Sequence, residues 1–276
     1  MNIVVVVNYN NPVVTENAIS NIKSKINNKD STLLYVVDNS DEKGSCKLLE
    51  KKFNENNIVF LYPKKNLGYM GAGGYAYKKY CDTNNEDIDL FMLMNNDVEI
   101  LTNNVIQEVS KVKDNKVMMI SPKLLMDGVN VNPYIKVRKS TLYMKVWTFI
   151  LSNFYLSKIC FFILKIKNKE NKENKENKEN KENVPSKTQI YGTHGAVFIL
   201  TKSFFRLGGR LDELPFLYGE EIYISEQICK MGGICQYNDK MIFSHVGSAT
   251  LGRKLSYFKY SCIRQAHKFL VKKYYK

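Results

Sequence analysis

Four short, continuous apolar runs at regular spacing constrain the fold of this chain most. They read IVVVV, LLYVV, IVFLY and LFMLM, at residues 3–7, 33–37, 58–62 and 90–94. Polar segments of helical length separate them, and an apolar stripe predicts a helix over 15–26 with Thr15 as its cap. Strands that are apolar throughout must be covered on both faces. The pattern therefore predicts an alternating α/β domain with a largely parallel sheet.

Polar residues follow each of these runs, at the point where each predicted strand ends. They are Asn8-Tyr9-Asn10, Asp38-Asn39-Ser40, Asn66-Leu67-Gly68 and Asn95-Asn96-Asp97. The carboxyl ends of parallel strands meet at one edge of a sheet, and open α/β sheets bind ligands there. A single polar end is also typical of a loop or a helix cap. Four together favour a binding cleft.

Asp97 is a candidate ligand for a hard divalent cation. Mg²⁺ and Mn²⁺ prefer oxygen ligands and keep much of their coordination for water and substrate phosphate, so one or two carboxylates at a strand end suffice. The tripeptide 95–97 is a reduced form of an Asp-x-Asp metal site, with an amide in place of the first carboxylate. The glycine-rich stretch 66–80 permits close backbone approach to a ligand, although its spacing matches neither a dinucleotide-binding fingerprint nor a P-loop.

Glu220 and Glu221 are adjacent carboxylates ahead of an apolar helical stripe. Such a pair can serve only to cap a helix and compensate its dipole. If both side chains line the cleft, mutual repulsion raises one pKa and makes a general base possible. His245 follows a later apolar run and is one of three histidines in the chain; it is either structural or a metal ligand.

The net charge of +14 comes from two segments. Residues 136–167 carry seven Lys and Arg and residues 253–276 carry eight, and neither segment has an acidic residue. This distribution is typical of a patch that meets an anionic surface. Within the first segment, 142–167 suits a helix lying in a membrane interface, or else a core helix. Basic aromatic surfaces also suggest a nucleic-acid-binding protein, but that reading leaves the four polar strand ends unexplained.

Several function classes are disfavoured by the sequence. The apolar run near the N-terminus is too short for a signal peptide or a membrane span, so we expect a first buried strand. Six cysteines form no C-x-x-C pair, which disfavours a disulfide framework or a zinc site and suggests a cytoplasmic protein. Five copies of Asn-Lys-Glu over 168–182 have no apolar member, and we expect a solvated insertion, disordered or transiently helical.

Seven short motifs occur in order along the chain, and together they resemble one family. They are Tyr-Asn at 9–10, Val-Asp-Asn-Ser at 37–40, Asn-x-Gly-x-x-Gly at 66–71, Asn-Asn-Asp-Val at 95–98, Gly-Gly-x-Leu-Asp-Glu at 208–213, Phe-x-Tyr-x-Glu-Glu at 216–221 and Ser-His-x-Gly-Ser at 244–248. The pattern resembles the inverting family 2 glycosyltransferases with the GT-A fold, in particular the bacterial rhamnosyl- and galactofuranosyltransferase-like branch. The resemblance covers nearly the whole chain except the Asn-Lys-Glu repeat.

The resemblance implies a GT-A, Rossmann-like, mostly parallel central sheet flanked by helices, with a C-terminal helical extension on the acceptor side. From the resemblance and the composition together, we expect one domain with five parts. These are a nucleotide-sugar-binding half at 1–135, a basic amphipathic segment at 136–167, the disordered repeat at 168–183, an acceptor and catalytic half at 184–252, and a basic C-terminal helix at 253–276.

The resemblance also assigns roles to individual residues. The catalytic base is Glu221 with Glu220 in support, although the family usually has Asp at the base position and which glutamate removes the proton is left open. Asp97 and His245 would hold Mn²⁺ or Mg²⁺. The expected donor- and substrate-binding residues are Tyr9, Asn10, Asp38, Asn66, Gly68, Gly71, Asn95, Asn96, His194 and Gly195.

The implied substrates are a UDP- or dTDP-linked sugar and a glycan acceptor, lipid-linked in this branch, in cell-surface polysaccharide synthesis. We expect a cytoplasmic protein, attached peripherally to the anionic inner face of the cell membrane through 142–167 and 253–276, and no nucleic-acid partner. The competing reading is a non-catalytic partner subunit with the same fold, which the missing first Asp of the metal motif suggests. The sequence leaves the oligomeric state open.

Overall fold

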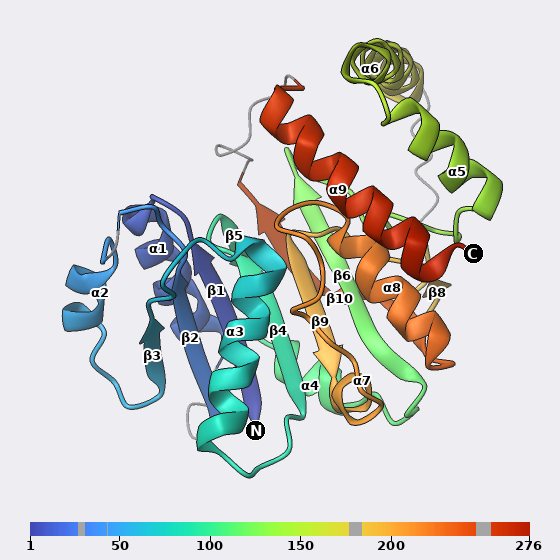
Figure 1. Cartoon of the computed structure of the whole chain (residues 1–276). Helices are drawn as coiled ribbons and strands as arrows, with labels where there is room; N and C mark the ends of the chain where they lie inside the picture. The colour runs from blue at the N-terminus through green and yellow to red at the C-terminus, as the bar shows by residue number, and fades with distance from the viewer. Residues whose placement is uncertain (27–30, 43, 177–183, 247–254) are drawn as a thin grey trace.

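The computed structural model describes residues 1–26, 31–42, 44–176, 184–246 and 255–276, and its strands form one central sheet with helices on both faces (Figure 1). The described strands are β1 Asn2–Asn8, β2 Thr32–Asp38, β3 Ile58–Leu61, β4 Leu90–Asn95, β5 Val98–Ile100, β6 Val117–Met126, β7 Val129–Asn130, β8 Gln189–Ile190, β9 Val197–Thr201 and β10 Ile234–His245. The described helices are α1 Pro12–Lys25, α2 Lys47–Lys52, α3 Gly68–Thr83, α4 Val105–Ser110, α5 Thr141–Ile150, α6 Phe154–Glu176, α7 Lys202–Arg206, α8 Glu220–Lys230 and α9 Tyr257–Tyr274.

The four apolar runs form β1 to β4, and these strands pair in parallel in the order β3-β2-β1-β4. Successive residues of β1 point to opposite faces of the sheet. Val4 and Val6 enter the core beneath α1, whereas Val5 and Val7 enter the core beneath α3. Because both faces are covered, every residue of β1 is buried, which confirms the predicted α/β class.

The second half of the chain makes the sheet mixed. β9 pairs antiparallel with β4 on one side and with β6 on the other, and β6 pairs in parallel with β10. The largely parallel arrangement therefore holds for β1 to β4 and for the β6–β10 pair. The reversed direction of β9 has a consequence for the site, because residues that precede an antiparallel strand lie at the edge where its parallel neighbours end.

The first helix begins earlier than the sequence suggests. α1 starts at Pro12, and its N-cap is Asn11, whose side chain accepts a hydrogen bond from the backbone N–H of Val14. Asn at the N-cap followed by Pro at the first helical position is a strong start signal, and it takes precedence over the expected Thr15 cap. Thr15 is buried one turn later, where its hydroxyl donates to Asn8 Oδ1 at 2.7 Å.

The C-terminal helix α9 is packed into the fold. Its buried residues are Tyr260, Cys262, Ala266, Leu270 and Tyr274. An ion pair reinforces the packing: Arg138 donates from Nε and Nη2 to the buried Glu226 carboxylate of α8, at 2.7 and 3.0 Å, and from Nη2 to the Tyr274 carbonyl. A bidentate pair of this kind fixes geometry as well as charge. The two basic segments thus meet in the fold, at α8.

Helices α5 and α6 lie beside α9 and away from the sheet (Figure 1). The first nine residues of the Asn-Lys-Glu repeat, 168–176, continue α6, and residues 177–183 lie outside the described part of the chain. No helix in the described ranges has both the length and the apolar character needed to cross a membrane. All six cysteines are free.

Gly68 at the start of α3 provides a test of how tightly the two halves fit together. Its φ is +72°, and a Cβ built there would lie 1.7 Å from the Phe216 carbonyl oxygen. We expect Gly68→Ala to lower the free energy of unfolding by about 3 kcal/mol, from backbone strain plus steric overlap. Urea denaturation measures this loss.

Gly128 is the matched control, because it has φ +74° and no heavy atom within 4 Å of an added Cβ. Gly128→Ala carries the same backbone strain without the overlap, so we expect a loss of only about 1 kcal/mol. Equal losses in the two variants would show that the contact between the α3 start and residue 216 is not tight.

Candidate active site

The structure brings the four polar strand ends together at one edge of the sheet, the upper edge in Figure 1. Hydrogen bonds connect them. Asn8 Nδ2 donates to Asp38 Oδ1 at 2.9 Å, linking the ends of β1 and β2. Asn39 Nδ2 donates to the Gly68 carbonyl at 3.1 Å, linking β2 to the start of α3. Asn96 Nδ2 donates to Thr15 Oγ1 at 2.9 Å, linking the end of β4 to α1.

Asp38 is a buried anchor of this edge. Its two carboxylate oxygens accept hydrogen bonds from Asn8, from Ser40 and Cys46 N–H groups, and from the Ser45 hydroxyl. Burial acts to raise the pKa of Asp38, but these hydrogen bonds outweigh it and hold the pKa below its ordinary value. The carboxylate thus orders the 38–46 loop, and its expected contact with a nucleoside stays a prediction.

Tyr9 and Asn10 lie at the surface above this anchor and share a partner that the sequence reasoning missed. The Tyr9 hydroxyl donates to Asp41 Oδ2 at 2.7 Å, and Asn10 Nδ2 donates to the same oxygen at 3.4 Å. The hydrogen bond to Asp41 raises the pKa of Tyr9. The sequence did contain a signal for Asp41, because this residue directly follows the Val-Asp-Asn-Ser motif.

The Asn-x-Gly-x-x-Gly motif shapes the start of α3. Asn66 Oδ1 accepts from the Gly68 N–H at 2.9 Å, and Asn39 Oδ1 accepts from the Leu67 N–H at 2.8 Å. Gly71 lies in the first turn of this 16-residue helix. The positive end of the helix dipole therefore points toward the edge where the polar strand ends gather.

Asp97 and His245 form the part of the site suited to a metal ion. His245 Nε2 lies 3.1 Å from Asp97 Oδ1, because β10 ends where β5 begins. The angles do not make this contact a hydrogen bond: Asp97 Oδ1 and both ring nitrogens of His245 are buried with no hydrogen-bond partner within the described residues. Buried polar atoms normally have partners. One carboxylate oxygen and one imidazole left unpaired fit a divalent cation.

The predicted metal site offers two protein side chains as ligands, Asp97 and His245. Across the described residues, no group of three or more His, Cys, Asp and Glu side chains is placed to hold a metal ion. Asn96 is turned away, toward Thr15, and the Asn95 N–H donates to the Ala196 carbonyl at 3.0 Å. Asp97 and His245 would therefore leave most coordination positions to water and substrate, as Mg²⁺ and Mn²⁺ allow.

His194 and Gly195 precede β9 and lie between two groups of side chains: Asp97 with His245 on one side, and the two glutamates of α8 on the other. The rings of His194 and His245 have centroids 6.0 Å apart. Burial and the neighbouring His245 lower the pKa of His194 to about 4, so the ring is neutral at pH 7. His194 Nδ1 accepts from the Ala196 N–H at 3.1 Å, which leaves Nε2 as the protonated nitrogen.

Glu220 and Glu221 begin α8 and are half-buried. Glu221 Oε1 accepts from the Gly195 N–H at 3.2 Å, and Glu220 Oε1 accepts from the Tyr218 N–H at 2.9 Å. Burial raises the pKa of Glu221. Burial and the charge of Glu221 raise the pKa of Glu220 to about 7. The two carboxylates are therefore held by different backbone N–H groups, and burial raises the pKa of both, which capping of a helix alone would not require.

Two tyrosines lie near the carboxylates of the candidate site. Burial raises the pKa of Tyr69, and the charges of Glu220, Asp97 and Glu221 raise it further. The Tyr69 hydroxyl contacts the carbonyls of Leu93 and Ala196 at 3.0 and 3.2 Å, at the junction of β4 and β9. One side chain thus senses carboxylates from both halves of the chain.

Tyr134 is the second tyrosine, and the sequence reasoning missed it. Its exposed ring meets the His194 ring edge to face at 4.9 Å, and burial of its hydroxyl and the charge of Glu221 raise its pKa. Asn132 holds this segment in place, since its Oδ1 accepts from the His194 N–H at 2.9 Å. No motif in the sequence marked residues 132–134.

Two further features concern the same region. The side chain of Gln227 in α8 is held by the backbone of Arg210: it accepts from the Arg210 N–H and donates to the Arg210 carbonyl, each at 2.9 Å. The last two residues of the Ser-His-x-Gly-Ser motif, 247 and 248, lie outside the described residues.

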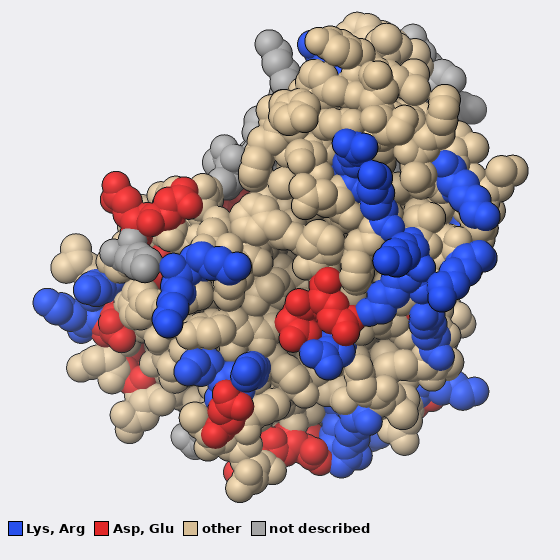
Figure 2. All heavy atoms as spheres, viewed as in Figure 1, with Lys and Arg blue, Asp and Glu red and all other residues tan. Residues whose placement is uncertain are grey.

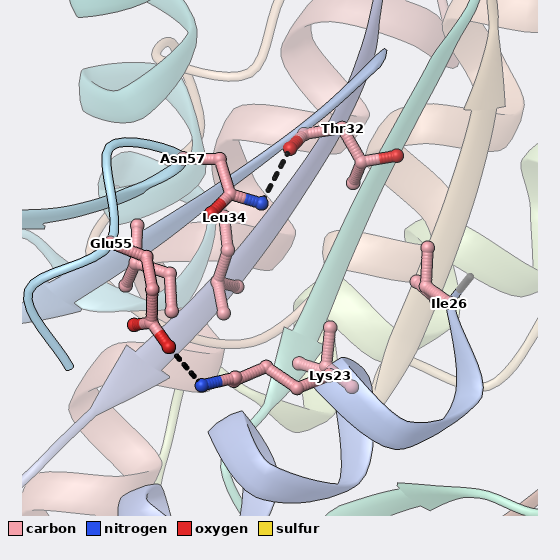
Figure 3. Close-up of a pocket in the computed structure, with 8 residues that line it drawn as sticks. Lys23, Ile26, Thr32, Leu34, Glu55 and Asn57 are labelled. Carbon is pink, nitrogen blue, oxygen red and sulfur yellow. Dashed lines mark hydrogen bonds and ion pairs between the residues drawn. The ribbon is translucent and has the colours of Figure 1, made fainter. Parts of the chain in front are cut away.

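A small cavity at the opposite edge of the sheet does not belong to this site (Figure 3). It measures about 60 Å³ and is bounded by Lys23, Leu34 and Glu55, beside Thr32 at the start of β2. Ligand sites for molecules of sugar-nucleotide size are several times larger. Lys23 and Glu55, which both line the cavity, form an ion pair with each other. The cavity lies near the amino ends of β2 and β3, away from the candidate site.

Comparison with known proteins was informative at the level of structure alone. No protein-family model matches the chain, and no curated protein sequence matches it. Solved structures do match. GalNAc-T7 in complex with UDP, GalNAc and Mn²⁺ superposes with a TM-score of 0.65 at 14% identity, over 99% of this chain and 47% of that one.

Two further matches are more distant. A mannosyltransferase from Pyrobaculum calidifontis in complex with GDP-Man and Mn²⁺ gives a TM-score of 0.52 at 13% identity, over 91% of this chain and 57% of that one. TarS from S. aureus gives 0.52 at 12% identity, over 90% and 37%. The chain thus spans about half the length of the structures it matches, and the likeness establishes the fold: that of the GT-A-type glycosyltransferases.

Proposed function

We propose that this chain is a metal-dependent, inverting glycosyltransferase that moves a sugar from a nucleotide-diphosphate donor to a hydroxyl of a glycan acceptor. One observation carries the proposal. Asp97 and His245, whose buried polar atoms lack hydrogen-bond partners among the described residues, lie at the same edge of the sheet as Glu220 and Glu221. The segment 194–195 lies between these two groups of side chains. A direct displacement at an anomeric carbon requires such opposed groups, one for the leaving group and one for the attacking hydroxyl.

The donor half of the site comes from the first half of the chain. Tyr9, Asn10 and Asp41 offer polar atoms for the nucleoside, and the N-terminal end of α3 offers a positive dipole for the diphosphate. Asp97 and His245 would hold the Mn²⁺ or Mg²⁺. When bound, the cation would neutralise the charge that develops on the departing nucleoside diphosphate. We propose a UDP- or dTDP-linked sugar as donor.

The acceptor half comes from α8 and the segment before β9. Glu221 would take the proton of the acceptor hydroxyl, whose oxygen forms a bond to the anomeric carbon as the bond to the diphosphate breaks. The nucleoside diphosphate leaves with that electron pair, from the face opposite the attack, and the anomeric configuration inverts. The Gly195 N–H holds Glu221 Oε1 in position, and a larger residue at 195 would displace it, because an added Cβ would lie 2.7 Å from that oxygen.

Glu220 would keep the negative charge on its neighbour. With a pKa of about 7, Glu220 is about half protonated at pH 7 and mostly protonated below it; in the protonated form the pair would carry one charge, on Glu221. Their different contacts support this division of roles, with Glu221 as base and Glu220 as its neutral partner, since Glu221 contacts the Gly195 N–H and Glu220 contacts the Tyr218 N–H.

The resemblance to the family 2 rhamnosyl- and galactofuranosyltransferase-like branch supports the finer parts of the proposal. It favours a lipid-linked glycan as acceptor, a role in cell-surface polysaccharide synthesis, and a cytoplasmic location. A thermal-shift screen of UDP-, dTDP- and GDP-sugars with and without Mn²⁺ tests the donor directly, because a ligand that binds the folded state raises its apparent stability.

Glu221→Gln tests the assignment of the base. The amide cannot accept the proton of the acceptor hydroxyl, so we expect turnover to fall by roughly 10² or more. Donor affinity, measured by thermal shift, should be retained. Turnover close to that of the unmodified protein would exclude Glu221 as the base, and a collapse of donor binding would indicate a structural role instead.

Asp97→Ala tests the metal assignment. Removing one of two protein ligands should abolish the extra stabilisation that Mn²⁺ gives to the nucleotide-sugar complex. Glu99→Ala, which removes a carboxylate two residues further along β5, is the matched control and should leave that stabilisation intact. The assignment is wrong if the two variants respond to Mn²⁺ alike.

Glu220→Gln tests whether Glu220 binds a proton in the folded state, through the pH dependence of the free energy of unfolding. The folded-state pKa of about 7 lies above the ordinary value of 4.5, so the folded state binds the proton more tightly and loses stability as pH rises between these values. Gln keeps the acceptor oxygen for the Tyr218 N–H. We expect the variant to gain stability relative to the unmodified protein from pH 4.5 to 7, as measured by urea denaturation at several pH values. A difference that does not vary with pH would contradict the raised pKa.

A further inference from the structure

Helices α5 and α6 carry apolar stripes that face outward. The most exposed apolar residues include Leu142, Val146 and Phe149 on α5 and Tyr155, Ile159 and Phe162 on α6; Tyr143, Ile163, Leu164 and Ile166 are exposed to a smaller extent. Both sets have the spacing i, i+4, i+7, which places each on one side of its helix. A stripe of this kind normally faces a protein core, but here Phe149 is 71% exposed and Phe162 is 64% exposed. We call these six most exposed residues, three on each helix, the outer stripe.

The opposite sides of the two helices are fixed to the rest of the fold. Met144 of α5 is buried, and its carbonyl lies 2.9 Å from Nε2 of His267 in α9. The Tyr260 hydroxyl of α9 donates to the Leu151 carbonyl at 3.0 Å. Phe154 at the start of α6 packs edge to face on the Tyr260 ring. The direction in which the outer stripe faces is therefore set by packing.

The charge around the outer stripe has a single sign. Residues 136–169 contain no Asp or Glu, and Lys139, Lys145 and Lys158 are exposed on and beside the two helices. In Figure 2 the upper part of the molecule, where α5 and α6 lie in Figure 1, is tan with blue side chains and shows no red among the atoms drawn in colour. An apolar face within a basic border is complementary to a surface that is apolar inside and anionic at its boundary.

We propose that the outer stripe and its lysines dock this protein on an anionic lipid bilayer. The helices are amphipathic and basic, which suits helices that lie in the plane of the headgroups, with apolar side chains in the acyl region and lysines at the phosphates. A second copy of the chain is a poorer occupant, because a two-fold contact through this face would bring the same unpaired bases together.

The docking face is linked to the acceptor side of the proposed site. α5 follows directly on the 132–138 segment, in which Asn132 accepts from the His194 N–H and Arg138 pairs with Glu226 of α8. A bilayer on the outer stripe would thus lie on the same side as the segment that carries Tyr134. This positional argument rests on the proposed function; membrane docking itself does not.

Co-sedimentation of the full chain with vesicles tests the proposal. We expect binding to vesicles that contain phosphatidylglycerol, weakening at high salt, and little binding to pure phosphatidylcholine. Phe149→Ser with Phe162→Ser should lower the partition coefficient tenfold or more. Lys145→Gln with Lys158→Gln should lower it by roughly thirtyfold, at about fivefold for each lysine near an anionic surface.

Val13→Ser with Leu48→Ser is the matched control. These residues are 68% and 77% exposed on α1 and α2, at the other end of the molecule, and we expect no change in partitioning. Circular dichroism and thermal unfolding confirm that each variant folds. Transfer to a water-soluble acceptor should be the same in all variants, so a failure of docking is distinguishable from a failure of the enzymatic proposal.

Three outcomes would overturn the proposal. One is the absence of binding to anionic vesicles at low salt. Another is equal binding by the outer-stripe variants and the control variant. The third is a dimer, seen by analytical ultracentrifugation, that the outer-stripe substitutions dissociate without changing partitioning; the face would then be an interface between copies.

Discussion

The pairing of β4 with β9 is the contact on which the site depends. It joins the half of the chain that ends in Asp97 to the half that carries Glu221, and it fixes their relative position through the register Met94↔Val197. A slip of one residue would turn every β9 side chain to the other face. Phe198 and Leu200 belong to the core beneath α3 and α8, whereas Val197 and Ile199 belong to the core beneath α1, so a slip would exchange side chains of different shape between two closely packed cores.

Asp38 and Asp97 lie at the same sheet edge in different environments. Both follow buried parallel strands. The oxygens of Asp38 accept hydrogen bonds from several groups and its pKa is lowered, so its charge is neutralised within the protein. Asp97 Oδ1 is buried without a hydrogen bond and faces an imidazole in the same state. A buried group without a partner destabilises the fold, and a ligand that supplies the missing contact recovers that stability.

The parts of the fold that follow from local pattern were predictable from sequence. The four apolar runs match β1 to β4 within about a residue, because a strand buried on both faces has a simple signature. The reversed β9 was not predictable, since a five-residue apolar run has no direction. At the site, motifs located Asp97, Glu221 and His245, whose residue types carry chemistry. Tyr134 was missed because only the folded chain reveals its neighbours, whereas Asp41 was missed although it directly follows the Val-Asp-Asn-Ser motif.

The two basic segments have similar composition and different roles, which composition alone does not distinguish. In α9 one apolar side is buried, through Tyr260, Leu270 and Tyr274, and only Tyr257 and Phe258 at its start are strongly exposed. A basic residue near its end is paired: Lys273 contacts Glu213. The excess positive charge of that helix is therefore partly neutralised within the fold. In α5 and α6 the outer stripe remains open among the described residues, and residues 136–169 contain no acidic residue to pair with Lys145 and Lys158. The same residue types thus stabilise the protein where a partner helix covers them, and form a surface for an external partner where none does.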